Sequence, residues 1–242
     1  MLADIYNVIL YQPIFNILVF FYNIVPGHDI GLAIILLTIL IKVVLSPFFV
    51  QSIKAQRAMQ RLQPKLDELK EKYKDNKEKL GPAIMQLYQK EKVSPFSSCI
   101  PLLIQLPFLI AVFQVFRVGL GNGTLDIVYP FIYNPGQINH IAFGFIDFSQ
   151  ASIALAVLAG LAQFIQSKSL LGKKNQLGGA KPSAMTAAMG KQMMYMMPVV
   201  TVLIGSSMPG GLTFYWFLVT ILGALQQIIV FKKMDQRVEV KT

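Results

Sequence analysis

The sequence is poor in the side chains that usually hold metals or perform catalysis. Its 242 residues include one cysteine, Cys99, and two histidines, His28 and His140. A single cysteine excludes an internal disulfide framework and a cysteine-rich metal site. The sequence has no Gly-x-Ser-x-Gly elbow, phosphate-binding loop or metal-binding histidine pair. We therefore expect a protein that is not an enzyme and that has no cofactor and no metal site.

Acidic residues are also scarce, with 12 Asp and Glu against 22 Lys and Arg. In a soluble protein this balance suggests nucleic acid, but 54% of the residues are hydrophobic and the mean hydropathy is +0.54. Such a composition is typical of a polytopic membrane protein. Twenty of the basic residues fall in three segments, 51–92, 168–191 and 232–241. The positive-inside rule places all three in the cytoplasm, where they would favour anionic lipid headgroups or the ribosome surface over a specific nucleic-acid sequence.

The apolar runs between these segments predict an all-α membrane protein with five spanning helices. The predicted order is an extracytoplasmic interfacial helix and turn over 1–29, spans at 30–50, 93–118, 149–166, 191–208 and 212–231, a cytoplasmic helical hairpin over 51–92, an extracytoplasmic loop over 119–148, a cytoplasmic linker over 167–190 and a cytoplasmic tail over 232–242. This order puts the N-terminus outside and the C-terminus in the cytoplasm.

Residues 5–25 are uncharged but interrupted by polar residues, and they have no basic n-region or small-residue cleavage site. They are not an ordinary signal peptide. We interpret them as a helix lying on the outer leaflet, with a spanning helix as the alternative.

The hairpin carries a narrow apolar stripe at spacings of three and four, formed by Met59, Leu62, Leu66, Leu69 and Tyr73. Gly81-Pro82 is expected to end its first helix and start the second. The hairpin is either a docking element or a solvated loop whose helices pack only on each other.

In the first span, Pro47 is expected to bend the helix.

One lysine, Lys42, lies inside the first span, about 12 Å from the basic end of that helix. An ammonium at this depth costs on the order of 2.5–3.5 kcal/mol. A partner charge, a wet cavity or a stem that reaches the surface must compensate. Thr38 lies one turn away on the same face.

Further polar groups lie near or within the spans, and they must face the bundle because lipid offers no hydrogen bonds. Each can also serve plain interhelical hydrogen bonding. They are Gln105, Gln114, Gln163, Gln166, Gln192 and Gln226. A methionine cluster in and before the fourth span suits flexible packing or a soft surface for hydrophobic partners, and a copper set is disfavoured because no His or Cys accompanies it.

Several motifs, taken together, resemble the YidC/Oxa/Alb membrane-protein insertase family over nearly the whole chain. They are Tyr11-Gln12-Pro13, Leu62-Gln63-Pro64-Lys65, the run from Leu87 to Pro95, the run from Cys99 to Pro107, Met196-Met197-Pro198, and Pro209-Gly210-Gly211-Leu212 before Tyr215. The chain resembles the compact five-span core of the family, of the bacterial YidC-like kind, without the large extracytoplasmic domain of Gram-negative members.

The resemblance implies a helical bundle with a hydrophilic groove that is open to the cytoplasm and the lipid and closed outside. The groove residue that is usually Arg in the family is Lys42 here, so the charge is kept but the planar guanidinium fork is lost. Thr38, Tyr215 and Trp216 match family positions that contact clients, although the two aromatic residues can also be ordinary packing.

The resulting hypothesis is an insertase of the bacterial inner membrane that works without nucleotide hydrolysis. Its expected partners are nascent membrane proteins, with the ribosome, the Sec translocon and membrane lipids as further candidates. The alternatives are a small ion or solute channel or transporter built around Lys42, or a lipid scramblase.

Overall fold

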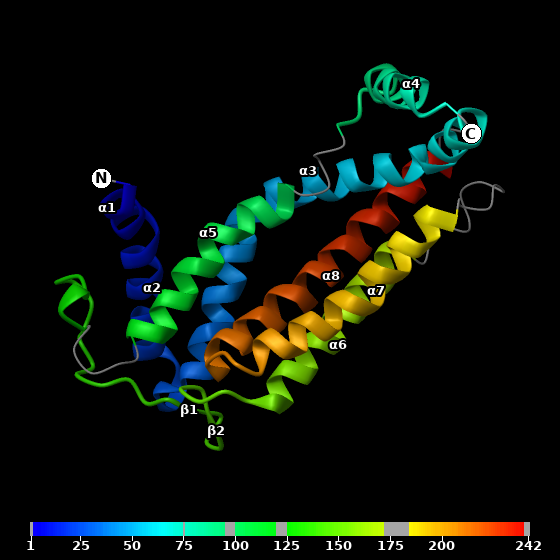
Figure 1. Cartoon of the computed structure of the whole chain (residues 1–242). Helices are drawn as coiled ribbons and strands as arrows, with labels where there is room; N and C mark the ends of the chain where they lie inside the picture. The colour runs from blue at the N-terminus through cyan, green and yellow to red at the C-terminus, as the bar shows by residue number, and fades with distance from the viewer. Residues whose placement is uncertain (1, 75, 95–99, 120–124, 172–183, 240–242) are drawn as a thin grey trace.

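The computed structural model describes residues 2–74, 76–94, 100–119, 125–171 and 184–239, and these residues are mostly helical (Figure 1). Cys99 and residues 172–183, which are half of the predicted linker, lie outside the described residues. The helices are α1 Leu2–Tyr6, η1 Asn7–Tyr11, α2 Gln12–Ile24, η2 Pro26–His28, α3 Ile30–Lys72, α4 Lys77–Lys90, α5 Ile100–Gln114, η4 Val115–Gly119, η5 Leu125–Ile127, α6 Ile153–Leu171, α7 Ala184–Gly205 and α8 Gly210–Glu239; the strands are β1 Ile141–Ala142 and β2 Ile146–Asp147.

Three helical stretches of the described residues are long and apolar enough to cross a membrane. They are Asp4–Ile24, which runs through α1, η1 and α2, then α3, and the part of α8 from Gly210 to Met234. Shorter apolar helices cover Leu103–Arg117, Ile153–Ser169 and Met194–Gly205. The chain is thus an all-α polytopic membrane protein, and the five-span count stays a prediction. Compared with the predicted spans, α6 begins later and ends later, α7 begins earlier at Ala184, and α8 continues into the predicted tail.

Helix α3 joins the first predicted span and the first arm of the hairpin in one helix of 43 residues. The Asp29 side chain begins it by accepting a hydrogen bond from the Leu32 amide at 3.0 Å. Pro47 and Pro64 lie inside the helix without ending it. Figure 1 shows that α3 changes direction between its apolar first half and its polar second half, as expected of a proline-containing helix.

The predicted helix boundary at Gly81-Pro82 is wrong, because α4 runs through both residues. The chain breaks earlier, between Lys72 and Lys77, where the Asn76 side chain accepts a hydrogen bond from the Lys79 amide at 3.2 Å. A capped start outweighs the single backbone hydrogen bond that Pro82 removes. An ion pair between Lys65 and Glu91 joins α3 to the chain that follows α4, and Leu62 and Leu66 of the predicted apolar stripe are buried.

Helices α6, α7 and α8 run side by side, and α8 also packs on α3 (Figure 1). The turn between α7 and α8 is held by backbone hydrogen bonds from Gly210 to Gln150 O, at 2.8 Å, and from Gly211 to Phe148 O, at 3.0 Å. A Cβ at Gly210 would lie 2.9 Å from Gln150 O, and one at Gly211 would collide with the Phe116 ring. Glycine is therefore required at both positions of this turn.

Helix α2 crosses the direction of α6, α7 and α8 instead of running alongside them (Figure 1). Its side chains hold the backbone of the loop that precedes β1. Asn16 donates from Nδ2 to Ile127 O at 3.0 Å and accepts at Oδ1 from the Tyr129 amide at 2.7 Å. Asn23 donates to Tyr133 O at 2.6 Å, and the Tyr22 hydroxyl accepts from the Asn139 amide at 3.0 Å. Helix α2 and this loop thus form one layer, which we call the outer cap.

At the end of β2, the Asp147 carboxylate accepts hydrogen bonds from the Ser149 hydroxyl, at 2.6 Å, and from the Ser149 amide, at 2.9 Å. These bonds lower the pKa of Asp147. The core of the protein joins the outer cap to the bundle, since Phe15 and Leu18 of α2, Phe148 of the loop and Tyr215 of α8 are all fully buried in one cluster.

We predict that Asn16→Leu destabilises the outer cap by about 1–3 kcal/mol, because the Tyr129 amide and Ile127 carbonyl lose their buried partner. The measurement is the midpoint of thermal unfolding of the purified protein in detergent. Asn7→Leu is the matched control because Asn7 is exposed. Equal midpoints for the two variants would show that the Asn16 hydrogen bonds do not hold the cap.

Candidate functional site

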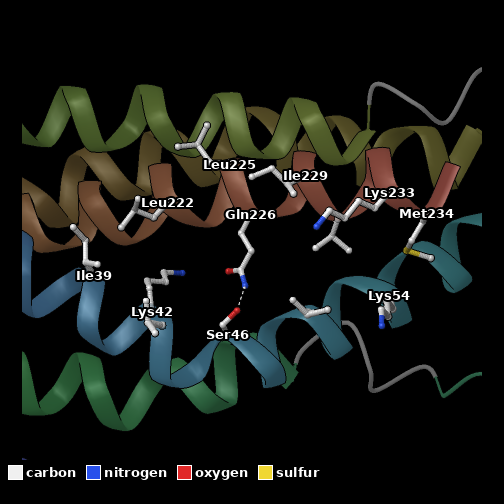
Figure 2. Close-up of a pocket in the computed structure, with 13 residues that line it drawn as sticks. Ile39, Lys42, Ser46, Lys54, Leu222, Leu225, Gln226, Ile229, Lys233 and Met234 are labelled. Atoms are coloured by element: carbon white, nitrogen blue, oxygen red, sulfur yellow. Dashed lines mark hydrogen bonds between the residues drawn. The ribbon is translucent and has the colours of Figure 1, made fainter. Parts of the chain in front are cut away.

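A cavity of about 590 Å³ lies between α3 and α8 (Figure 2). We call it the groove. The residues that line it are Ile39, Lys42, Val43, Ser46, Val50 and Lys54 of α3, and Leu222, Leu225, Gln226, Ile229, Val230, Lys233 and Met234 of α8. The α3 residues cover 15 helical steps, or roughly 22 Å. Most of the wall is apolar, and its polar groups are three lysines, one amide and one hydroxyl.

The groove ends before it reaches the outer cap. On the cap side of Ile39, the α3 residues Ile34 and Leu37 are almost fully buried in the core. On α8, Leu212 and Tyr215 are buried at the same end. In the other direction the lining continues to Lys54 and Lys233, which are both exposed. The groove is therefore one-sided, with its open end at the basic ends of the two helices.

Lys42 lies in the part of the groove that is farther from these ends. Figure 2 shows its amine directed into the space between α3 and α8. Nζ lies 4.3 Å from the centre of the Phe49 ring, one and a half to two turns along α3, so the ring face offers a cation–π contact. The cost of placing this ammonium in the membrane is therefore offset by a cavity and an aromatic ring and not by a partner charge, because no acidic residue lines the groove.

Gly223 of α8 leaves the room that the Lys42 amine occupies. A Cβ built at Gly223 would lie 3.4 Å from Lys42 Nζ and 3.0 Å from Gln166 Nε2 of α6. Two polar side chains from different helices therefore meet at the position of one missing side chain. Gln166 was predicted as a polar groove residue, and the structure brings it to the Lys42 amine without making it a lining residue.

A hydrogen bond crosses the groove one turn farther along. Gln226 donates from Nε2 to the Ser46 hydroxyl at 3.2 Å (Figure 2). Gln226 was predicted from the sequence as a groove residue, and it lines the cavity. Ser46 lies four residues after Lys42, on the same face of α3. The bridge sets the separation of the two helices between the deep lysine and the two exposed ones.

Other predicted site residues lie in the packed interior. Thr38 is fully buried, and its hydroxyl donates to Ile34 O of its own helix at 2.6 Å. Tyr215 is also fully buried, and its hydroxyl accepts a hydrogen bond from Gln105 Nε2 of α5 at 2.9 Å. None of the three lines the groove. Gln105 and Tyr215 thus form an interhelical hydrogen bond, which was the alternative role for the polar residues in the spans.

The remaining predicted site residues are not gathered with Lys42. Gln114, Gln163 and Trp216 are half-buried, and none of them lines the groove. Gln192 is exposed on α7 and lies 3.4 Å from the Met196 sulfur. The polar set thus divides into a groove group, formed by Lys42, Gln166 and Gln226, and residues that pack elsewhere.

Four residues that shape the groove are not among the sequence predictions: Ser46, Lys54, Gly223 and Lys233. Helical spacing could have found two of them, because Ser46 follows Lys42 by four residues and Lys233 follows Gln226 by seven, so each falls near the face of its predecessor. Lys54 follows Lys42 by twelve residues, which turns it by about 120° from the face of Lys42 on a straight helix. The role of Gly223 depends on the approach of α6 and α3, which no spacing within α8 reveals.

Within the described part of the chain, no group of three or more His, Cys, Asp or Glu residues is placed to hold a metal ion. The groove itself offers amines, an amide and a hydroxyl to a guest. It suits an anionic or polar guest beside an apolar one, because charged donors and a hydrocarbon wall share one cavity.

These features define the class of the protein: a polytopic α-helical membrane protein with a one-sided, lysine-bearing groove. A model of the family described as "60Kd inner membrane protein" matches residues 20–237. The chain therefore belongs to this family, which is the YidC/Oxa family that the sequence motifs resemble, and it is an integral protein of the inner membrane.

The relatives have the same name but differ in length. The membrane protein insertase YidC of Fusobacterium nucleatum is 32% identical over 205 residues, which cover 85% of this chain and 87% of that protein. The proteins of this name from Geobacter metallireducens and Magnetococcus marinus are 28% and 30% identical over 223 and 228 residues. The matches cover 92% and 93% of this chain but only 37% and 36% of those proteins.

We predict that water reaches the groove. In a Cys99→Ala background, Ser46→Cys should react with a membrane-impermeant maleimide added from the basic side, because thiolate forms only where water is present. Thr38→Cys, at a buried position, and Val44→Cys, at an exposed position outside the groove, should react much more slowly. Equal, slow labelling at all three sites in membranes would contradict a hydrated groove.

Proposed function

We propose that this protein inserts membrane proteins by letting the polar part of a client enter the groove from the cytoplasm. The observation that carries the proposal is a cavity between α3 and α8 that holds the Lys42 amine deep in an apolar section and ends before the outer cap. The names of the relatives support an insertase over a channel or transporter. Insertion moves a polypeptide without making or breaking covalent bonds, so this function is not enzymatic.

The groove lowers the barrier by shortening the apolar path. A polar tail that enters it remains beside water and donors over part of the membrane thickness, and only the remaining distance is hydrocarbon. Lys42 attracts acidic groups of the tail toward the closed end. Gln226 and Ser46 exchange their mutual hydrogen bond for bonds to the client backbone.

The apolar segment of the client supplies the driving force. On α3, Val43 lines the groove and Val44 and Phe48 are exposed outside its lining, so they present an apolar surface along which such a segment can slide. Its transfer into lipid releases about 25 cal/mol per Å² of apolar surface removed from water. No nucleotide is required for this step.

The basic segments set the orientation and the partners that we propose. We assign the end of the groove with Lys54 and Lys233 to the cytoplasm by the positive-inside rule, with the N-terminus and the outer cap outside and the C-terminus inside. The direction of α2, which crosses the bundle helices, supports an interfacial position for residues 5–25 (Figure 1). The α3–α4 hairpin and the basic tail are docking sites for the ribosome, the Sec translocon or the client.

The first test concerns the charge. Lys42→Ala should lower insertion of a client with an acidic tail about fivefold or more, the scale of a solvated charge pair, while Lys42→Arg should retain activity. Growth of a depletion strain and protease protection of the client are the measurements. A client with a neutral tail is the control, since it should be affected much less. Normal insertion by Lys42→Ala would remove Lys42 from the mechanism.

The second test locates the client. A photoreactive amino acid at Val43 or Leu222, which line the groove, should crosslink to a nascent single-span client. The same probe at Thr38 should not crosslink while the helix stays packed, because the native side chain there is fully buried. Adducts from Thr38 but from neither groove position would place the client path elsewhere.

A further inference from the structure

At its open end, the groove is lined by basic side chains. Lys54 of α3 and Lys233 of α8 both line it there, and both are exposed. Within the described residues, neither lysine forms an ion pair. Figure 2 shows the Lys233 side chain extending from α8 along the groove toward Gln226, and Lys54 lies on the facing helix α3. This end of the groove thus has one lysine from each of its two helices.

The wall between this opening and the Ser46–Gln226 hydrogen bond is hydrocarbon. It consists of Val50 from α3 and of Ile229, Val230 and Met234 from α8, with Leu225 farther in. No acidic residue is among the lining residues. A guest that fills this section is therefore anionic at the open end and apolar along the wall.

The depth of the lysines matches the layers of a bilayer. Lys54 follows Lys42 by twelve residues, about 18 Å of helix. Lys42 lies about 12 Å inside the basic end of the apolar run, so Lys54 lies beyond the hydrocarbon, at the level of the headgroups. The guest therefore has its charge in the headgroup layer and its apolar part in the hydrocarbon layer.

We propose that the groove binds an anionic phospholipid of the inner leaflet, with the headgroup phosphate between Lys54 and Lys233 and one acyl chain along the apolar wall toward Lys42. This lipid occupies the groove when no client is present and leaves when a client enters. Lipid binding rests on the geometry of the groove, while displacement of the lipid by a client rests on the proposed function.

The test is retention of lipid by the full-length protein. The protein is placed in nanodiscs of phosphatidylglycerol and phosphatidylethanolamine in equal parts and released for native mass spectrometry without any client. The wild-type protein should retain phosphatidylglycerol preferentially. Lys54→Gln combined with Lys233→Gln should lower this preference about fivefold per lysine, the contribution of one basic residue near an anionic surface.

The matched control removes the same charge elsewhere. Lys232→Gln combined with Lys79→Gln changes two exposed lysines that do not line the groove, and the preference should remain. Leu225→Trp, which narrows the groove, should reduce retention of both lipids. An equal loss in the two double variants, or no preference in the wild-type protein, would overturn the lipid site.

Competition with inorganic phosphate tests whether the groove binds the whole lipid or only a phosphate group. It should not displace the bound lipid, because the acyl chain contributes to binding, and displacement at millimolar phosphate would contradict the proposal. Client insertion by the Lys54→Gln/Lys233→Gln variant is measured separately. Lipid loss with normal insertion would support the lipid site alone, and failed insertion by Lys42→Ala with normal lipid retention would support the two sites independently.

Discussion

A charged amine in the apolar section of α3 is the constraint on which the structure around it depends. The Lys42 amine is placed over the Phe49 ring and beside the space left by Gly223. The Ser46–Gln226 bond joins α3 and α8 across the groove. Farther along, Ile53 meets Val230 and Phe231 in a small apolar cluster. The two helices are therefore in contact at the Ser46–Gln226 bond and again at Ile53, and most of the groove wall between them is apolar.

The core near the outer cap has the opposite character. Aromatic side chains from α2, the loop, α5 and α8 fill it, and two of its polar side chains are hydrogen-bonded. Thr38 bonds to its own helix and Tyr215 to Gln105. Close packing at this end is what makes the groove one-sided, because a helix pair that separated along its whole length would open a path through the membrane. The outer cap thus contributes to the function of a site that it does not touch.

The sequence predicted the fold class, the family and the deep lysine, but it predicted the site only in part. Apolar runs and basic segments are local signals, so they indicate that helices are present but not the residues at which each one begins and ends. Periodicity also groups residues by helix face, which is why Lys42 and Thr38 were assigned to one face. It does not say where a face changes from core to cavity, and that boundary falls between these two residues.

Two further differences between the predictions from the sequence and the structure have similar causes. Gly223 matters because of what approaches it from α3 and α6, and a glycine within an apolar run gives no sign of this. At Gly81-Pro82 the sequence contained a familiar break signal, but the Asn76 cap a few residues earlier starts the helix first. Local patterns compete, and the outcome depends on the relative free energies of a cap and of one lost backbone hydrogen bond.

The continuity of α3 has a mechanical consequence. Its first half provides one wall of the groove and its second half provides one arm of the α3–α4 hairpin, with no loop between them. A helix transmits tilt and rotation along its axis, whereas a flexible linker would absorb them. A tilt of the hairpin arm would therefore reach the groove wall at Ser46 through helical backbone that contains Pro47 but is not interrupted.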